Sequence, residues 1–291
     1  MSLLYDLLAA PFVDFAFMRR ALVACAALAV GCGPVGVLLL LRRMSLVGDS
    51  MSHAVLPGAA IGFVISGLSL VSMSIGGFVA GLLVALASGV VTRVTQLRED
   101  ASFAAFYLIS IALGVLIVST RGSNVDLMHV LFGTILAVDN HSLLLVSAIA
   151  TISIAVLAVI YRPLIIECFD PAFLRSVGGH GASYHILFLV LVVLNLVAGF
   201  QALGTLMAVG LMMLPAAAAR FWSAEVWALA AVSAAIALVS GYVGLLVSFH
   251  FDLPSGPAIV LTAGVIYLVS LAVGRKGSLR QNLIAQPHYE S

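Results

Sequence analysis

Long, uninterrupted apolar runs dominate this chain, and polar residues fall mainly between them. The runs show neither the alternation of a half-buried strand nor the heptads of a coiled coil. A membrane-spanning helix needs about 20 apolar residues. We therefore expect an all-α, polytopic transmembrane helical bundle of about nine spans, with eight or ten as alternatives. The predicted spans lie near residues 21–41, 46–66, 70–92, 101–120, 142–161, 184–200, 203–219, 226–249 and 256–274.

The composition fits a protein that lies mostly in lipid. Of the 291 residues, 63% are hydrophobic and 9% are charged, against about 25% charged in an average soluble domain. The net charge of +1 offers no basic surface for nucleic acid. The sequence contains no phosphate-binding loop of the GxxxxGKS/T type, no HExxH and no GxSxG. We therefore expect a membrane protein that is not itself an enzyme.

Arginines set the expected orientation, because cytoplasmic loops of membrane proteins carry an excess of basic residues. They cluster in the connections near 42–43, 93–100, 162–183 and 220 and in the tail, which we place in the cytoplasm, with the N-terminus outside. Arg121 and the pair Arg19–Arg20 do not follow this pattern. The three cysteines, Cys25, Cys32 and Cys168, form no CxxC pair, and we interpret them as packing thiols. The chain divides into an N-terminal interfacial segment 1–20, a transmembrane domain 21–274 and a cytoplasmic C-terminal tail 275–291.

The most informative chemistry interrupts the apolar run 46–66, where Asp49 and His53 are four residues apart. On a helix this spacing places both side chains on one face. An ionisable pair within a membrane segment is costly and by default marks a transport path or a relay. A carboxylate and an imidazole suit Zn²⁺ or Mn²⁺, but two ligands are too few, so a second copy or other helices would complete the site. The alternative is a hydrogen-bonded pair that fixes helix packing.

Further polar residues lie near the pair and on the side expected to face outward. Pro57 would kink or interrupt the helix and free backbone carbonyls near the pair. Asp126, His129 and His141 could form a funnel for cations, and a solvated loop with ordinary histidines is the alternative. Asp252 lies in a Pro- and Gly-rich turn before the last span. It could extend the same path, although we favour a role as the cap of that helix.

A short helix is predicted within the connection 162–183. Asp170 can act as its N-cap and Pro171 fits the first helical position, while Gly178 and Gly179 would end it. Such a helix on the cytoplasmic face could dock a partner or lie on lipid headgroups. His180 and His185 flank the following span, and we interpret them as incidental.

Six ordered motifs resemble the permease subunit of bacterial zinc/manganese-type metal-ion ABC importers. They cover nearly the whole chain, and Ala218 stands where the family usually has threonine. The motifs are Arg42–Met44 with Gly48–Gly58, Arg98–Asp100, Val125–Met128 with Leu131–Gly133, Asp170–Pro171 with Gly178, Leu214–Arg220, and Asp252–Pro257.

The resemblance implies a fold of the vitamin-B12-importer type in the bacterial cytoplasmic (inner) membrane. It implies a pathway formed by two copies of the chain, separate cytoplasmic ATP-binding subunits and an extracytoplasmic metal-binding protein. By position, Asp49 and His53 would contact the metal in transit. The substrate would be Zn²⁺ or Mn²⁺, with Fe²⁺ as a third option, and no cofactor would be bound permanently. The residues that match the ATPase-coupling segment are Asp170, Pro171, Arg175 and Gly178.

Two other classes of protein remain open from the residues alone. An ion-gradient-driven secondary metal carrier would need buried carboxylates for its coupling ion, and apart from Asp49 the predicted spans offer few. A membrane-embedded metalloenzyme could use Asp49, His53 and a distant histidine. Neither explains a capped cytoplasmic helix as directly as an importer does.

Overall fold

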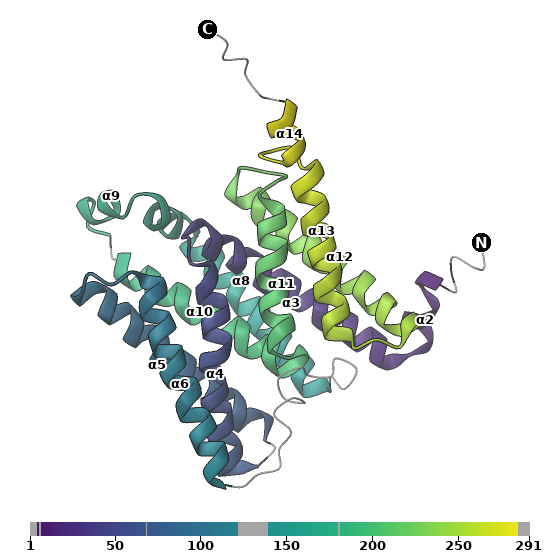
Figure 1. Ribbon diagram of the computed structural model, residues 1–291, viewed down its shortest axis with the longest axis horizontal. Coiled ribbons are helices and arrows are strands. Elements are labelled where there is room, and N and C mark those ends of the chain that lie inside the picture. Colours follow the sequence, from purple (N-terminus) through teal and green to yellow (C-terminus); the bar gives the residue numbers. More distant parts are fainter. Residues whose placement is uncertain (1–4, 6, 68, 122–138, 180, 285–291) are drawn as a thin grey trace.

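A computed structural model describes residues 5, 7–67, 69–121, 139–179 and 181–284 of the chain (Figure 1). Within these ranges all regular structure is helical. The helices are α2 (Ala10–Asp14), α3 (Ala16–Leu41), α4 (Ser45–Ser66), α5 (Leu70–Val94), α6 (Glu99–Arg121), α8 (Asn140–Phe169), α9 (Pro171–Ser176), α10 (Gly181–Leu203), α11 (Thr205–Ala219), α12 (Val226–Phe251), α13 (Ser255–Val273) and α14 (Leu279–Ile284).

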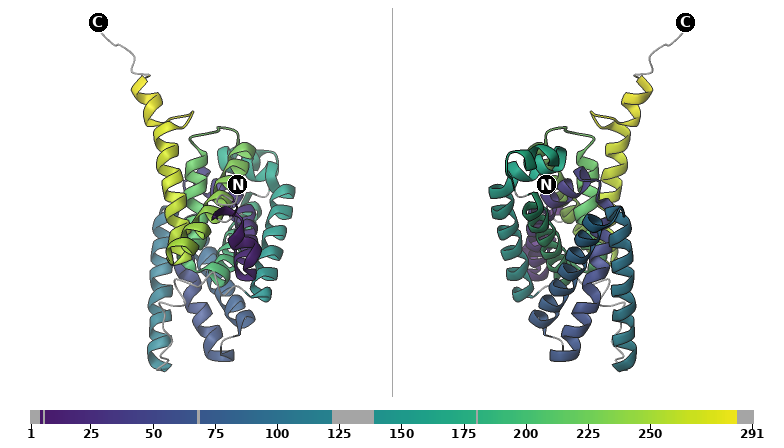
Figure 2. Two further views of the ribbon diagram at one scale, coloured as in Figure 1. Left: turned by 90° about the vertical axis from the view of Figure 1, so that its right-hand side faces the viewer. Right: turned by 90° about the vertical axis from the view of Figure 1, so that its left-hand side faces the viewer.

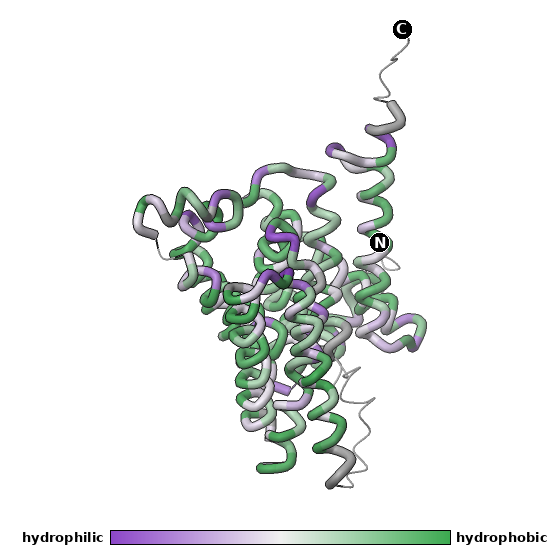
Figure 3. Tube along the Cα trace, turned by 60° about the vertical axis from the view of Figure 1, so that its left-hand side comes forward, coloured by the Kyte–Doolittle hydropathy of each residue, from purple (hydrophilic) through white to green (hydrophobic). Residues whose placement is uncertain are grey.

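Seven of the described helices are long and apolar enough to cross a membrane, namely α3, α5, α6, α8, α10, α12 and α13. Helix α4 has 22 residues and α11 is a shorter apolar helix, and with these two the number reaches the predicted nine. In Figure 3 most hydrophilic positions lie near helix ends, while the long helical stretches are hydrophobic. The expectation of an all-α, polytopic bundle is confirmed, and the chain is a multi-pass membrane protein.

The connections rich in arginine lie at one end of the molecule. The region around α9, the α11–α12 connection and α14 are at this end, and the α4–α5 connection is at the other (Figure 2). A separation of this kind is what the excess of basic residues in cytoplasmic loops requires. We refer to the end with α9 and α14 as the inner end and to the opposite end as the outer end.

Helix α8 extends beyond its predicted limit. We expected a span ending at residue 161 and a long loop from Arg162, but the helix continues through Pro163 to Phe169. The ring of Pro163 removes one helical hydrogen bond, whereas Leu164, the next residue, is fully buried. The connection predicted at 162–183 is therefore mostly helical, and only α9 and short turns separate α8 from α10.

The N-terminal segment packs against the outer end of α12. Phe12 stacks on Tyr242 with 5.1 Å between ring centroids, and the Tyr242 hydroxyl donates to the carbonyl oxygen of Leu8 at 2.9 Å. Helix α3 already begins at Ala16, so the end of the predicted segment 1–20 belongs to a spanning helix. The interfacial placement of this segment stays a prediction.

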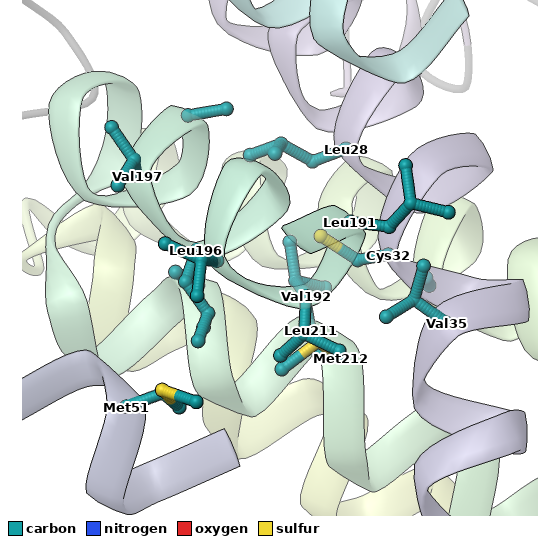
Figure 4. Packing of buried hydrophobic residues seen from close by; sticks show 14 of the residues in the cluster. Leu28, Cys32, Val35, Met51, Leu191, Val192, Leu196, Val197, Leu211 and Met212 are labelled. Carbon is teal, nitrogen blue, oxygen red and sulfur yellow. The ribbon is translucent and has the colours of Figure 1, made fainter. Parts of the chain in front are cut away.

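The core lies where α3, α10 and α11 meet, and α8 and α12 pack around it (Figure 4). Cys25 and Cys32 are each 1% exposed, which confirms their interpretation as packing thiols. The buried Asn195 of α10 donates through Nδ2 to Ser153 Oγ of α8 at 2.7 Å and to the Leu191 carbonyl at 2.8 Å. Buried amides are costly unless they are hydrogen-bonded, so this contact fixes α10 against α8.

Small residues bring α4 and α5 into direct backbone contact. A Cβ atom on Gly58 would overlap the carbonyl oxygen of Gly76, and a Cβ on Gly76 would overlap that of Gly58. Gly62 lies in the same way against the backbone of Ser72. Such small residues let membrane helices approach closely, and here they hold the helix that carries Asp49 and His53.

Candidate metal pathway

Helix α4 brings the predicted acid–imidazole pair together. Arg43 has a φ of 59°, and this left-handed residue turns the chain sharply between α3 and α4. Asp49 Oδ1 and His53 Nε2 are 3.9 Å apart, which is longer than a hydrogen bond. At 1.5 Å per residue, Asp49 lies about 6 Å and His53 about 12 Å from the first residue of α4.

Asp49 faces away from the rest of the protomer, and His53 is partly covered by it. The Asp49 side chain is 65% exposed and that of His53 is 37% exposed. Met51, between them, is fully buried. Residues spaced three and four apart extend this face along the helix, where Leu56 and Ala60 are half-buried and Val64 is exposed. We call this face the α4 stripe, and it consists of Asp49, His53, Leu56, Ala60 and Val64.

Helix α6 supports the pair from the side. The ring of Tyr107 lies next to His53, with 6.1 Å between ring centroids and an interplanar angle of 29°. The Ser110 hydroxyl donates to the Ala54 carbonyl oxygen at 3.2 Å. The sequence alone does not point to Tyr107, because a single aromatic residue in an aliphatic span carries no periodic signal.

Pro57 does not interrupt α4, which runs unbroken to Ser66. Because proline has no N–H, the carbonyl oxygen of His53 lacks its usual donor four residues later. Gly114 of α6 lets the two helices meet here, since a Cβ on Gly114 would be 2.9 Å from the Cβ of Pro57. An additional acceptor is therefore available on one of the two residues of the pair.

The predicted outer funnel is only partly within the described residues. Asp126 and His129 lie outside them. His141 is exposed in the first turn of α8, and Asp139 caps this helix by accepting the Ser142 N–H at 2.8 Å. Hydrogen bonds from the Ser142 side chain and backbone hold the pKa of Asp139 below its usual value. A carboxylate next to His141 therefore stays charged at neutral pH.

Asp252 does not cap the last span, contrary to the interpretation we favoured. It ends α12 in a left-handed conformation with a φ of 51°, and α13 begins after Pro254 without a side-chain cap. The chain closes this turn instead through the Leu253 N–H, which donates to the Ser248 carbonyl oxygen at 3.1 Å. Among the described residues no three His, Cys, Asp or Glu side chains gather to hold a metal ion, so neither His141 nor Asp252 joins the α4 pair.

The short inner helix forms as predicted. The Phe173 N–H donates to Asp170 Oδ1 at 2.9 Å, so Asp170 is the N-cap of α9. Gly178 has a φ of 76°, and the Gly179 N–H donates to the Leu174 carbonyl oxygen at 2.8 Å, which ends the helical segment. The geometry of a capped helix is confirmed.

Arg42, which the sequence did not single out for this role, connects α3, α8 and α10 beside α9. Arg42, at the end of α3, donates through Nε to Cys168 Sγ of α8 at 3.1 Å and through Nη1 to His185 Nδ1 of α10 at 2.6 Å. Its guanidinium also lies 4.9 Å from the centre of the Phe188 ring. His185 therefore has a structural partner, and since arginine only donates, its Nδ1 must be the acceptor. Whether His185 contacts a departing ion stays untested. The sequence does not predict this contact, because the partners are far apart in the chain.

An ionisable pair within a spanning helix by default marks a transport path or a relay, and helix α4 carries such a pair in Asp49 and His53. A family model described as the ABC 3 transport family matches residues 14–274. The chain belongs to this family, and it is a multi-pass permease subunit of the bacterial cytoplasmic membrane.

Similar proteins cover almost the whole chain. The manganese import system permease protein ScaB of Streptococcus parasanguinis is 32% identical over 269 residues, which are 91% of this chain and 95% of ScaB. The chelated iron transport system membrane protein YfeD of Yersinia pestis is 31% identical over 93% of this chain and 90% of its own length. The solved structure of PsaBC from Streptococcus pneumoniae, in complex with Fab, matches with a TM-score of 0.82 and 30% identity, over 94% of this chain and 99% of that one.

Proposed function

We propose that this chain forms, together with a second copy of itself, the pathway of an ATP-driven importer for divalent transition-metal ions, with Mn²⁺ as the preferred substrate. ATP would be hydrolysed by separate cytoplasmic subunits, and an extracytoplasmic binding protein would deliver the ion. Asp49 and His53 would contact the ion in transit. His141, Asp252 and the two residues outside the described ranges, Asp126 and His129, would attract it at the outer end.

The observation that carries this proposal is the outward position of the pair on α4. A charged side chain at the centre of a spanning helix costs about 2.5–3.5 kcal/mol even on the lowest scales. The cost is smaller near the helix end, where Asp49 lies, and His53 is one turn closer to the centre. Asp49 is mostly exposed in the single protomer, and the described residues of one copy gather no third His, Cys, Asp or Glu side chain beside the pair. A second copy facing the α4 stripe would provide another carboxylate and another imidazole, and four ligands suit a dication that must also leave again.

The relatives favour manganese over the other ions, whereas the donor set suits all three. Oxygen and nitrogen ligands suit Mn²⁺, Fe²⁺ and Zn²⁺ alike, so Asp49 and His53 do not decide between them. ScaB is a manganese import permease and YfeD is a chelated iron transport protein by name. Measuring the uptake of Mn²⁺ in competition with Fe²⁺ and Zn²⁺ gives the preference of the importer among the three ions. We expect the preference to be highest for Mn²⁺.

The coupling role of α9 is supported by its surface. Phe173 and Val177, four residues apart, are 52% and 62% exposed, whereas Leu174 between them is 5% exposed and anchors the helix. Two exposed apolar side chains, one on the capped helix and one in the turn directly after it, suit insertion into a groove of another protein. Through Cys168, Arg42 connects the end of α8, just before α9, with α3 and α10. Motion imposed on α9 would therefore reach the spanning helices.

Replacing the cap of α9 tests this coupling role. We expect Asp170→Ala to weaken binding of the ATPase subunit about fivefold, because a lost N-cap costs about 1 kcal/mol. Asp170→Asn keeps an acceptor for the Phe173 N–H and should bind like the unchanged protein. Binding of the purified ATPase subunit to the detergent-solubilised permease measures both variants. Equal binding by Asp170→Ala would contradict a docking role for α9.

The function as a whole is tested by reconstitution. Proteoliposomes containing the permease, its ATPase and its binding protein are expected to accumulate radiolabelled Mn²⁺ only when ATP is present on the side of the ATPase. An ion-gradient-driven carrier, the alternative from the sequence, would accumulate the metal without the ATPase. Membership in the ABC 3 transport family argues against that alternative.

A further inference from the structure

A hollow of about 660 Å³ opens at the inner end of the molecule, and neither Asp49 nor His53 lines it. The ends of α3, α11, α12 and α13 surround it, and its apolar lining includes Leu40, Leu41 and Leu229. Arg220 and Lys276 line it as well. Among the described residues of the lining there is neither Asp nor Glu, so the hollow combines apolar walls with positive charge.

The two cations are not neutralised within the described part of the chain. Arg220 directly follows α11 and Lys276 lies three residues after the end of α13, and both are exposed. No carboxylate of the described residues lies within ion-pair distance of either cation, and the one ion pair found there is that of Asp49 and His53. Two unpaired cations beside a hollow produce a positive potential that attracts an anionic group.

The α11–α12 connection is fastened to the end of α13, so the cations are held in place. The Lys276 N–H donates to the Phe221 carbonyl oxygen at 2.9 Å, and Trp222 Nε1 donates to Ser270 Oγ at 2.9 Å. Gly274 allows the close approach, because a Cβ there would be 2.5 Å from the Cβ of Phe221. The hollow is therefore formed before any ligand binds.

Its surroundings are those of a membrane–water interface. Trp222 and Trp227 are 39% and 65% exposed beside it, and Tyr267 lies in its wall. Such aromatic residues mark the level of the lipid headgroups. Exposed apolar side chains continue from this level along α13, and they are Leu261, Val265, Leu268, Val269 and Val273.

We propose that this hollow binds an anionic phospholipid of the cytoplasmic leaflet. Its phosphate would lie between Arg220 and Lys276, and its acyl chains would lie along the exposed apolar side chains of α13. Basic pockets between spanning helices on the cytoplasmic side suit such headgroups. The proposal concerns the helix ends next to the coupling region and does not depend on which metal the pathway carries.

Native mass spectrometry of the intact permease–ATPase complex tests the proposal. The complex is released from vesicles containing equal amounts of phosphatidylglycerol and phosphatidylcholine, and the lipid that stays bound is counted. The unchanged complex is expected to retain phosphatidylglycerol in preference to phosphatidylcholine. Arg220→Gln/Lys276→Gln is expected to reduce this retention about thirtyfold, since each basic side chain near an anionic headgroup contributes about fivefold.

Two further variants distinguish lipid binding in the hollow from a general effect of positive charge on the protein surface. Arg162→Gln/Arg280→Gln removes the same charge from exposed positions outside the hollow and should retain the lipid fully. Ala224→Phe keeps both cations but fills the lining, and it should lose the lipid.

Four results would overturn the proposal. Equal retention of both lipids would do so, and so would equal losses in the two double variants. Displacement of the lipid by an equal concentration of inorganic phosphate would assign the site to free phosphate. Loss of ATPase binding with unchanged lipid retention in Arg220→Gln/Lys276→Gln would assign the hollow to the protein partner.

Discussion

Asp49→Ala is expected to lower manganese uptake at least about tenfold while the permease stays in the membrane at its normal level. Removing a group that merely supports a metal ligand typically costs about 10–100-fold in affinity, and a ligand itself should matter no less. The fold should survive, because Asp49 is mostly exposed and its carboxylate is 3.9 Å from His53, beyond hydrogen-bond distance. Uptake by cells that depend on this importer, normalised to permease level, measures the effect.

Two comparisons make the result specific to the pair. Asp14→Ala removes an equally charged, exposed side chain at the end of α2 and should leave uptake unchanged. His53→Ala should lower uptake as Asp49→Ala does, and the double variant should be little worse than either, because two ligands of one ion act together. Full uptake by Asp49→Ala would remove the pair from the mechanism.

Gly58→Ala is expected to destabilise the protein by about 1–3 kcal/mol, the usual cost of overpacking a tight contact. The added Cβ would overlap the carbonyl oxygen of Gly76 and lie 2.6 Å from the Cβ of Ala80. Since neither backbone can move alone, α4 must shift away from α5 and carry Asp49 and His53 with it. Both the thermal unfolding midpoint in detergent and manganese uptake should therefore fall.

Gly89→Ala is the matched control. Gly89 lies on α5, like Gly76, but nothing comes within 4 Å of a Cβ placed there. A helical glycine replaced by alanine in open space gains about 0.5–1 kcal/mol, so this variant should be as stable as the unchanged protein or slightly more stable. If Gly58→Ala unfolded at the same temperature as Gly89→Ala, the close crossing of α4 and α5 would not be required.

Most of the fold could be predicted because apolar length alone identifies a membrane-spanning helix. Seven helices meet that criterion, and α4 and α11 begin within two residues of their predicted starts. The end of α8 could not be predicted in this way. Arg162 and Pro163 are normally signals of a helix end, but the burial of Leu164 outweighs the hydrogen bond that proline removes.

The candidate site could be predicted only where its residues are close in the sequence. The spacing of Asp49 and His53 was enough to place them side by side, and Asp170 was recognised as a cap from its neighbours. The contact of Tyr107 with His53 and those of Arg42 with Cys168 and His185 join separate helices. Local sequence carries no information on such contacts. The prediction for Asp252 was wrong because an aspartate between two helices can either end the first helix in a left-handed conformation or cap the second. The neighbouring residues are the same in both cases, and here Asp252 ends α12.

The central claim is that a divalent ion passes between Asp49 and His53 of two facing copies. Anomalous X-ray scattering from Mn²⁺ in crystals of the permease–ATPase complex tests it most directly. We predict one peak between the two copies, within direct bonding distance of the carboxylate of Asp49 and the imidazole of His53 in each. A manganese peak elsewhere in the pathway, with both side chains turned toward lipid, would contradict the claim.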